Sequence, residues 1–254
     1  MKSQVNNSNG LKIAVEVEGD LTSDKLVFIT HGLSGSKDQP HIIGMREAFV
    51  NEGYTVVSFD TTYSFGESEG DPVNATATSY ISDLEDVIAW AEQQEWYKEP
   101  FALAGHSLGG ISSLVYASKH PNKVSTIFPM STVVSGKLWH EIQDPEYLKG
   151  WKEKGYYFKE SQSMPGRSGN VGYGLAEDLL NYDALEFATD IKCPVLLLVG
   201  SEDEGTTPKM HQLLHDKLGG SKELHIVEGM EHTPRNQQEI DEMKKVIKDW
   251  LNKL

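Results

Sequence analysis

The sequence is poor in the features that mark exported or membrane-spanning proteins. Its 254 residues include one cysteine, Cys193, so no internal disulfide can form and a cytoplasmic location is expected. No apolar run approaches the roughly 20 residues that a helix needs to cross a bilayer. The first residues, MKSQVNNSNG, contain no apolar stretch of the kind found in secretory signals. We therefore expect neither a signal peptide nor a membrane span.

Positive charge is also scarce. Lysine and arginine together number 23 against 38 aspartates and glutamates, which gives a formal net charge of −15. Such a surface repels phosphate backbones, so nucleic acid is not an expected partner. His211 and His215 are four residues apart, as in an H-E-x-x-H motif, but Gln212 stands where that motif has its glutamate. No loop has the spacing of an EF-hand, so we expect no metal and no other cofactor. The expected partner is a small-molecule substrate, and the sequence leaves the oligomeric state open.

What the sequence does contain is an alternation of strand and helix patterns. A hairpin is predicted around a turn at Asn9-Gly10. Short apolar runs, typical of strands buried on both faces, follow at 25–30, 54–60, 100–105, 123–130, 193–200 and 222–229. Helical periodicity occurs at 76–96, 107–120, 207–218 and 234–253, and the last helix is expected to begin at Pro234. These patterns predict an α/β protein with a mostly parallel sheet.

Residues 131–190 interrupt this alternation. They contain no predicted strand and are rich in aromatic residues. A segment of about 60 residues is too long for a plain connection. We predict that it forms a cap or lid on a core made of residues 1–130 and 191–254, with Trp139 and Trp151 as candidates for lining a substrate site. A small satellite core that covers the sheet is the alternative, and both can hold.

The run ALAGHSLGG ends a predicted strand and begins a predicted helix. Gly105 to Gly109 form the pattern G-x-S-x-G in the strand–turn–helix context that gives this motif its meaning. The glycines are needed because a larger residue two positions to either side of the serine would clash with a neighbouring strand or helix. The motif predicts that Ser107 is a nucleophile held out above the sheet at the N-terminus of a helix.

A serine hydroxyl needs a histidine base and an orienting carboxylate. His232 follows the last predicted strand, at the sheet edge where open α/β sheets build their sites. The stretch VGSEDEGTTP follows the penultimate strand and contains three adjacent acids, Glu202, Asp203 and Glu204. The position of this loop in the chain does not show which of the three orients the histidine.

The remaining histidines have other expected roles. His106 is expected to pack sideways, and His225 lies inside a strand pattern. His120, His211 and His215 lie on predicted helices, where a solvated or capping role is expected, and His41 and His140 have no strand-end context.

These motifs resemble those of the serine hydrolases of the α/β-hydrolase fold over nearly the whole chain. The matching stretches are THGLSG (30–35), FDTTYSFGESEGD (59–71), GHSLGG (105–110), VGSEDEGTTP (199–208) and GMEHTP (229–234). In layout the chain is similar to small bacterial carboxylesterases, including cinnamoyl and feruloyl esterases, and to monoglyceride lipases. The resemblance implies an eight-stranded, mostly parallel sheet with helices on both faces and a cap insertion.

The resemblance also implies roles for individual residues. Ser107 corresponds to the nucleophile, His232 to the general base and acid, and Asp203, at the end of a Gly-x-x-Asp pattern, to the orienting acid. The backbone N–H groups of Leu33 and Leu108 correspond to the oxyanion hole. The resemblance assigns His31, which precedes this loop, a structural role.

One stretch departs from the family pattern. Many relatives carry a basic residue and Gly-His-Gly after the aspartate that corresponds to Asp60, where this chain has TTYSFGESEG. We expect Tyr63 and Phe65 of this stretch to border the substrate pocket.

The implied activity is hydrolysis of carboxylic esters of small to medium acyl or aryl acids through an acyl-enzyme intermediate. A serine at position 107 argues against haloalkane dehalogenases and epoxide hydrolases, which use an aspartate there. Thioesterase, acyltransferase, C–C bond hydrolase, peptidase and perhydrolase activities remain open, because the same three residues serve each of them. The alternative of a different class is a ligand-binding module that keeps the fold without the chemistry.

Overall fold

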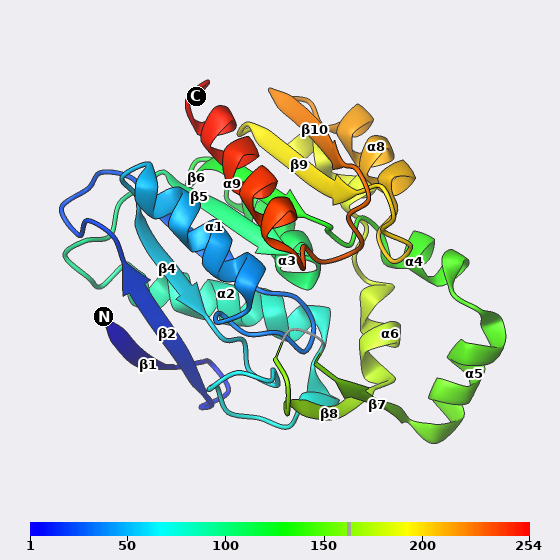
Figure 1. Cartoon of the computed structure of the whole chain (residues 1–254). Coiled ribbons are helices and arrows are strands. Elements are labelled where there is room, and N and C mark those ends of the chain that lie inside the picture. Colours follow the sequence, from blue (N-terminus) through cyan, green and yellow to red (C-terminus); the bar gives the residue numbers. More distant parts are fainter. Residues whose placement is uncertain (162–163) are drawn as a thin grey trace.

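The computed structural model describes residues 1–161 and 164–254 and is built around an eight-stranded sheet (Figure 1). The strand order is β1-β2-β4-β3-β5-β6-β9-β10. The strands are β1 (Lys2–Asn6), β2 (Lys12–Glu18), β3 (Leu26–Thr30), β4 (Thr55–Phe59), β5 (Phe101–His106), β6 (Val124–Met130), β9 (Val195–Gly200) and β10 (Lys222–Val227). β2 is antiparallel to β1 and to β4, and the other neighbouring strands are parallel. The predicted mostly parallel sheet with an edge hairpin is therefore confirmed.

Helices cover both faces of the sheet. On one face, α1 (Pro40–Asn51) and α9 (Gln237–Leu251) lie side by side and share an apolar core with the central strands (Figure 1). On the other face, α2 (Ala77–Ala91), α3 (Leu108–Lys119) and α8 (Pro208–Lys217) form the larger core. This arrangement puts the amino end of α3 directly after β5, where the serine motif was found.

Two helix predictions need correction. The sequence analysis did not predict α1, because its buried face includes the polar residues His41 and Arg46, which hide the apolar stripe. The last helix begins at Gln237 rather than at Pro234. Asn236 caps it by accepting a hydrogen bond from the backbone N–H of Glu239, whose side chain in turn accepts one from the backbone N–H of Asn236.

The segment 131–190 contains strands, so the prediction that it has none is wrong. Its elements are α4 (Gly136–Ile142), α5 (Pro145–Lys154), β7 (Tyr156–Glu160), β8 (Ser168–Gly172), α6 (Gly174–Leu179), α7 (Ala184–Phe187) and a 3-10 turn at Ala188–Asp190. Another 3-10 turn, Pro72–Asn74, lies outside this segment, before α2. β7 and β8 pair as an antiparallel hairpin. The pattern was hidden because aromatic residues lie on both faces of β7 and glycines lie within β8. That the segment acts as a cap stays a prediction.

Among the described residues, no helix combines the length and the apolar character needed to cross a membrane.

Candidate active site

Ser107 lies in the sharp turn between β5 and α3. Its backbone has φ 55° and ψ −112°, a conformation that residues with a side chain rarely adopt and that is typical of functional sites. A Cβ on Gly105 would lie 2.2 Å from the carbonyl oxygen of Gly109, and a Cβ on Gly109 would lie 2.2 Å from that of Thr30. The two glycines are therefore required by close backbone contacts, as the motif predicts.

Asp203 and His232 meet at the edge of the sheet where the parallel strands end. Asp203 follows β9 and His232 follows β10, and the ring Nδ1–H of His232 donates to Asp203 Oδ2 over 2.9 Å. A Cβ on Gly200 would lie 1.9 Å from the carbonyl oxygen of Met230, so this glycine allows the two loops to touch. β5 ends at the same edge, which brings the serine turn to that side of the sheet as well.

Asp203 is held as a carboxylate by several donors. Its side chain is buried, and burial alone would raise its pKa. The hydrogen bonds from His232 and Thr206 outweigh this effect and hold the pKa of Asp203 well below its usual value. Oδ1 accepts from the backbone N–H of Gly205 (2.9 Å) and of Thr206 (2.8 Å), and Oδ2 accepts from the Thr206 hydroxyl (2.8 Å). This carboxylate can orient a histidine ring and stabilise positive charge on it.

The structure brings only one of the three adjacent acids to His232. Asp203 is buried, whereas Glu202 and Glu204 are exposed to solvent. Successive side chains of this loop point in different directions, so one carboxylate reaches the histidine and its neighbours do not. The catalytic role of Asp203 stays a prediction.

His106 connects the turn that carries Ser107 (the serine turn) to the loop after β10 that carries His232 (the histidine loop). Its Nε2–H donates to the backbone carbonyl of His232 over 2.9 Å, and the centres of the two rings are 4.9 Å apart. His41 of α1 packs on His106 with a ring separation of 4.6 Å. Burial lowers the pKa of His41 to about 3 and holds that of His106 well below its usual value, so both rings are neutral. Among the described residues, no hydrogen bond joins Ser107 Oγ to His232, and such bonds often form fully only when substrate binds.

The backbone N–H groups of Leu33 and Leu108 are available to a ligand. In the described part of the chain, neither donates to a protein acceptor. Leu108 is the first residue of α3, where the N–H groups of a helix have no partner within the helix. An oxyanion hole requires two such donors, and this role for the pair stays a prediction.

The loop that carries Leu33 is held by buried hydrogen bonds. His31 Nδ1–H donates to the carbonyl of Gly32 over 2.7 Å, and its Nε2 accepts from the backbone N–H of Thr61 over 3.0 Å. The hydroxyl of Tyr80 donates to the same Gly32 carbonyl over 2.9 Å. These contacts give His31 the structural role that the resemblance implies.

A buried lysine that the sequence analysis did not single out fixes the next part of this loop. The Lys37 side chain is 1% exposed, and its Nζ lies 3.4 Å from Asp60, 2.9 Å from Asp38 and 2.7 Å from Glu67. Burial by itself would lower the pKa of Lys37, but the hydrogen bonds to Glu67 and Asp38 and the charge of Asp60 raise it above its usual value. No local pattern marks Lys37, because two of its partners lie 23 and 30 residues away.

Tyr63 and Phe65 lie in the loop that departs from the family pattern. Phe65 is 5% exposed, and its ring would lie 3.0 Å from a Cβ on Gly169 of β8. Tyr63 has a φ of 62°, and its ring would lie 2.4 Å from a Cβ on Gly70. Phe65 therefore contacts the segment 131–190, whereas Tyr63 packs within its own loop. Substrate contact for both residues stays a prediction.

Trp139 and Trp151 occupy different places in the segment 131–190. Trp139 of α4 is half-buried against the large core. Trp151 of α5 is 4% exposed, its ring centre is 4.8 Å from that of Tyr157, and its Nε1–H donates to the carbonyl of Val171 over 3.1 Å. Trp151 thus packs α5 against the β7–β8 hairpin. Substrate contact for either tryptophan stays a prediction.

The prediction that His211 is solvated or caps a helix is wrong. Its ring is fully buried, and its Nε2 accepts from the backbone N–H of Thr132 over 3.0 Å. Its Nδ1–H donates to the carbonyl of Thr207 over 3.1 Å. The ring therefore ties α8 to the end of β6, a contact across 79 residues that helical periodicity cannot reveal.

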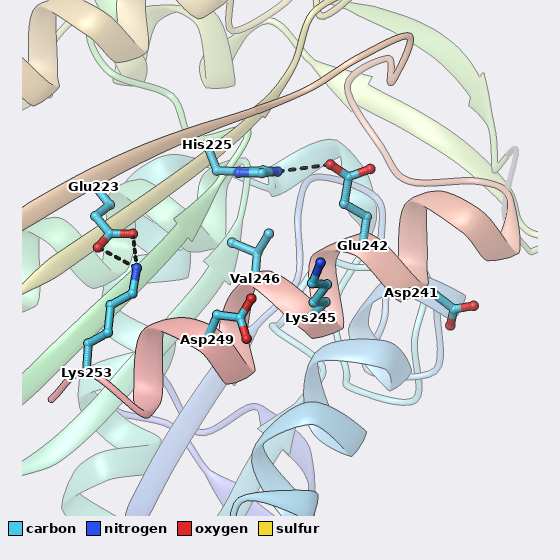
Figure 2. A pocket seen from close by; sticks show the side chains of 8 residues that line it. All are labelled: Glu223, His225, Asp241, Glu242, Lys245, Val246, Asp249 and Lys253. Atoms are coloured by element: carbon cyan, nitrogen blue, oxygen red, sulfur yellow. Dashed lines mark hydrogen bonds and ion pairs between the residues drawn. The ribbon is translucent and has the colours of Figure 1, made fainter.

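No residue of the candidate site lines the groove of about 470 Å³ between β10 and α9 (Figure 2). Two pairs lie in its lining: Lys253 with Glu223 at 2.8 Å and His225 with Glu242 at 3.0 Å. Within residues 1–161 and 164–254, no group of three or more histidine, cysteine or acidic side chains is arranged to hold a metal ion.

Residues 8–159, more than half of the chain, match the X-Pro dipeptidyl-peptidase family (S15 family). The chain belongs to this family. Ser107 lies within the S15 match, whereas Asp203 and His232 lie beyond its end. The mitochondrial palmitoyl-protein thioesterase ABHD10 of Homo sapiens is 24% identical over 237 residues, which cover 91% of this chain and 74% of that protein. The pimeloyl-[acyl-carrier protein] methyl ester esterase of Neisseria meningitidis is 28% identical over 168 residues, which cover 53% of this chain and 63% of the esterase.

Solved structures share the fold of this S15 family member over its whole length. Est1E from Butyrivibrio proteoclasticus with bound ferulic acid has a TM-score of 0.82 at 16% identity and covers 99% of this chain and 98% of its own. Alpha/beta hydrolase domain-containing protein 10 from mouse has a TM-score of 0.79 at 19% identity and covers 100% and 99%. The family match makes the chain a hydrolase, and these structures show that it has the α/β-hydrolase fold.

Proposed function

We propose that the protein is a serine hydrolase that cleaves carboxylic esters of small to medium acyl or aryl acids through an acyl-enzyme intermediate. The observation that carries the proposal is the 2.9 Å hydrogen bond between His232 and the buried carboxylate of Asp203, formed at the sheet edge where the Ser107 turn also lies. The esterases and thioesterases among the similar proteins support the same reaction class.

The proposed reaction begins with attack of Ser107 Oγ on the ester carbonyl carbon. His232 takes the serine proton on Nε2, while Asp203 keeps Nδ1 protonated and stabilises the charged ring. The N–H groups of Leu33 and Leu108 bind the oxygen that becomes negative. His232 then gives its proton to the departing alcohol, which leaves Ser107 acylated. In the second half, His232 activates a water molecule that releases the acid and restores the serine.

A thioesterase is the second candidate. The relative ABHD10 is a palmitoyl-protein thioesterase that aligns with 91% of this chain. The same three residues cleave a thioester without change, because only the leaving group differs. Which of the two activities the protein has must therefore be decided by comparing its rates on ester and thioester substrates.

The test combines a covalent probe with a substrate panel. We expect a fluorophosphonate to label the wild-type protein and not Ser107→Ala, and we expect p-nitrophenyl esters of rising chain length to be cleaved. Ser107→Ala should lower kcat by at least about 10⁴-fold while its circular dichroism stays unchanged. Palmitoyl-thioester and Xaa-Pro p-nitroanilide substrates complete the panel. A protein that is neither labelled nor active on any ester refutes the proposal, and cleavage of the Xaa-Pro amide alone replaces it with a peptidase.

A further inference from the structure

The inner face of the β7–β8 hairpin carries a lysine. Along β7 the side chains alternate: Tyr156, Phe158 and Glu160 are exposed, whereas Tyr157 and Lys159 are half-buried. Tyr157 packs on Trp151, and both belong to or pack against the larger core, which places the half-buried side of β7 toward that core. Lys159 therefore points inward, although lysine is among the residues least often buried.

The lysine lies over a position without a side chain. Lys159 pairs with Gly169 in the register of the hairpin, and residues directly opposite each other in an antiparallel pair share a face. A Cβ on Gly169 would lie 3.0 Å from the ring of Phe65 and 3.3 Å from Pro72. The inner face of the hairpin thus rests on the loop that contains Phe65.

This face adjoins the candidate oxyanion loop. The backbone N–H of Phe65 donates to the carbonyl of Gly35 over 3.3 Å, two residues after Leu33. The hydroxyl of Ser36 donates to the sulfur of Met164, beyond the end of β7, over 3.0 Å. The hairpin that carries Lys159 is therefore held against the loop that is proposed to bind the oxyanion.

The ammonium of Lys159 has no partner in the described part of the chain. Within residues 1–161 and 164–254, no hydrogen bond or ion pair to it is formed, and burial lowers its pKa. Lys37 differs from Lys159 in this respect, because the ammonium of that buried lysine forms ion pairs with three carboxylates. The other lysines of the segment 131–190 all have partners: Lys137 with Glu186, Lys149 with Glu146, Lys152 with Glu177, and Lys154 over the ring of Tyr156.

An ammonium partly withdrawn from water without a counter-charge is destabilising, and such groups cluster at binding and catalytic sites. We propose that Lys159 binds a carboxylate on the substrate, so that the protein prefers esters that carry a free carboxylate remote from the bond that is cleaved. This proposal rests on the proposed esterase function. A bound carboxylate supplies, through a charge-assisted hydrogen bond, the partner that Lys159 lacks among the described residues.

The test compares esters that differ only in this carboxylate. In the first pair, mono-p-nitrophenyl adipate carries a free carboxylate at the end of its acyl chain, and p-nitrophenyl hexanoate has the same chain length without it. In the second pair, 4-acetoxybenzoate carries the free carboxylate on the alcohol part that leaves, and methyl 4-acetoxybenzoate has that carboxylate blocked as a methyl ester. Cleavage of the acetyl ester is compared. We expect the wild-type enzyme to favour the charged member of one pair by at least about 10-fold in kcat/KM.

Lys159→Met should remove this preference by raising KM for the charged ester, with the neutral ester cleaved within about two-fold of the wild-type rate. Lys159→Arg should retain the preference, and Lys154→Met, which removes an exposed lysine, should leave both esters unchanged. The wild-type comparison tests the proposal even where a variant does not fold. No preference for either charged ester, or an equal loss on charged and neutral esters in Lys159→Met, overturns the proposal. Failure of fluorophosphonate labelling and of all ester cleavage overturns the esterase function instead.

Discussion

The ring of His106 and the backbone of His232 are joined by a hydrogen bond of 2.9 Å, from Nε2–H of the one to the carbonyl oxygen of the other. The two residues belong to different parts of the proposed catalytic site: His106 directly precedes the nucleophile Ser107, and His232 is the proposed base in the loop after β10. The bond fixes the distance between the serine turn and the histidine loop. His106 is thus a positioning residue for the proposed reaction, which the sequence analysis expected only to pack sideways.

Replacing His106 by leucine should lower kcat for esters by roughly 10- to 100-fold with little change in KM, because a shift of the base by about 1 Å has effects of that size. His106→Gln keeps a donor and should recover part of the loss. Steady-state kinetics of both variants measure this split. His225→Leu, which removes a histidine paired with Glu242 near the surface, is the matched control. Equal kcat values for His106→Leu and His106→Gln would contradict the positioning role.

Asp203→Asn should lower kcat by about 10⁴-fold, because an amide cannot hold Nδ1 of His232 protonated as the carboxylate does. Glu202→Gln and Glu204→Gln remove one charge each from exposed positions of the same loop and should stay within about two-fold of wild type. Initial rates on the best ester of the panel measure all three variants. A large loss in Glu204→Gln with a small one in Asp203→Asn would move the acid to Glu204.

The sequence predicted what depends on local pattern. Eight strands, the edge hairpin and the serine turn were all predictable, because apolar runs and glycine spacing are properties of short stretches. The choice of Asp203 among three acids came from the family resemblance, and the buried contact with His232 agrees with that choice.

What the sequence could not reveal depends on contacts between distant segments. Helix α1 buries His41 and Arg46, so its pattern does not look apolar. The carboxylates around Lys37, and the burial of Lys159 without a counter-charge among the described residues, arise only when segments that are far apart in the chain meet. The sequence alone does not distinguish a lysine with three carboxylate partners from one that has none in the part of the chain that the structure describes.

Lys37→Met should destabilise the fold by about 3–5 kcal/mol, because it leaves the carboxylate of Asp60 buried without its cation. Urea denaturation followed by circular dichroism measures the loss in free energy of unfolding. The double variant Lys37→Met with Asp60→Asn should be less unstable than the sum of the two single changes. Lys244→Met, which breaks the exposed pair with Glu47, is the control and should cost less than about 1 kcal/mol. Equal losses for Lys37→Met and Lys244→Met would show that the buried network stabilises the fold no more than an exposed ion pair does.

Buried histidines should make the protein sensitive to mild acid. Burial lowers the pKa of His41 to about 3 and that of His211 to about 4, whereas in the unfolded chain a histidine pKa lies near 6.5. The unfolded state therefore binds more protons below pH 6.5, so stability is full above that pH and is lost as the pH falls toward 4. Each such histidine contributes about 1.4 kcal/mol per pH unit within that window. His41→Phe should reduce the slope of unfolding free energy against pH by this amount, whereas Ile42→Val, its buried and non-titrating neighbour, should lower stability equally at every pH. An unchanged slope in His41→Phe would show that His41 takes up protons equally in the folded and the unfolded protein, contrary to its lowered pKa.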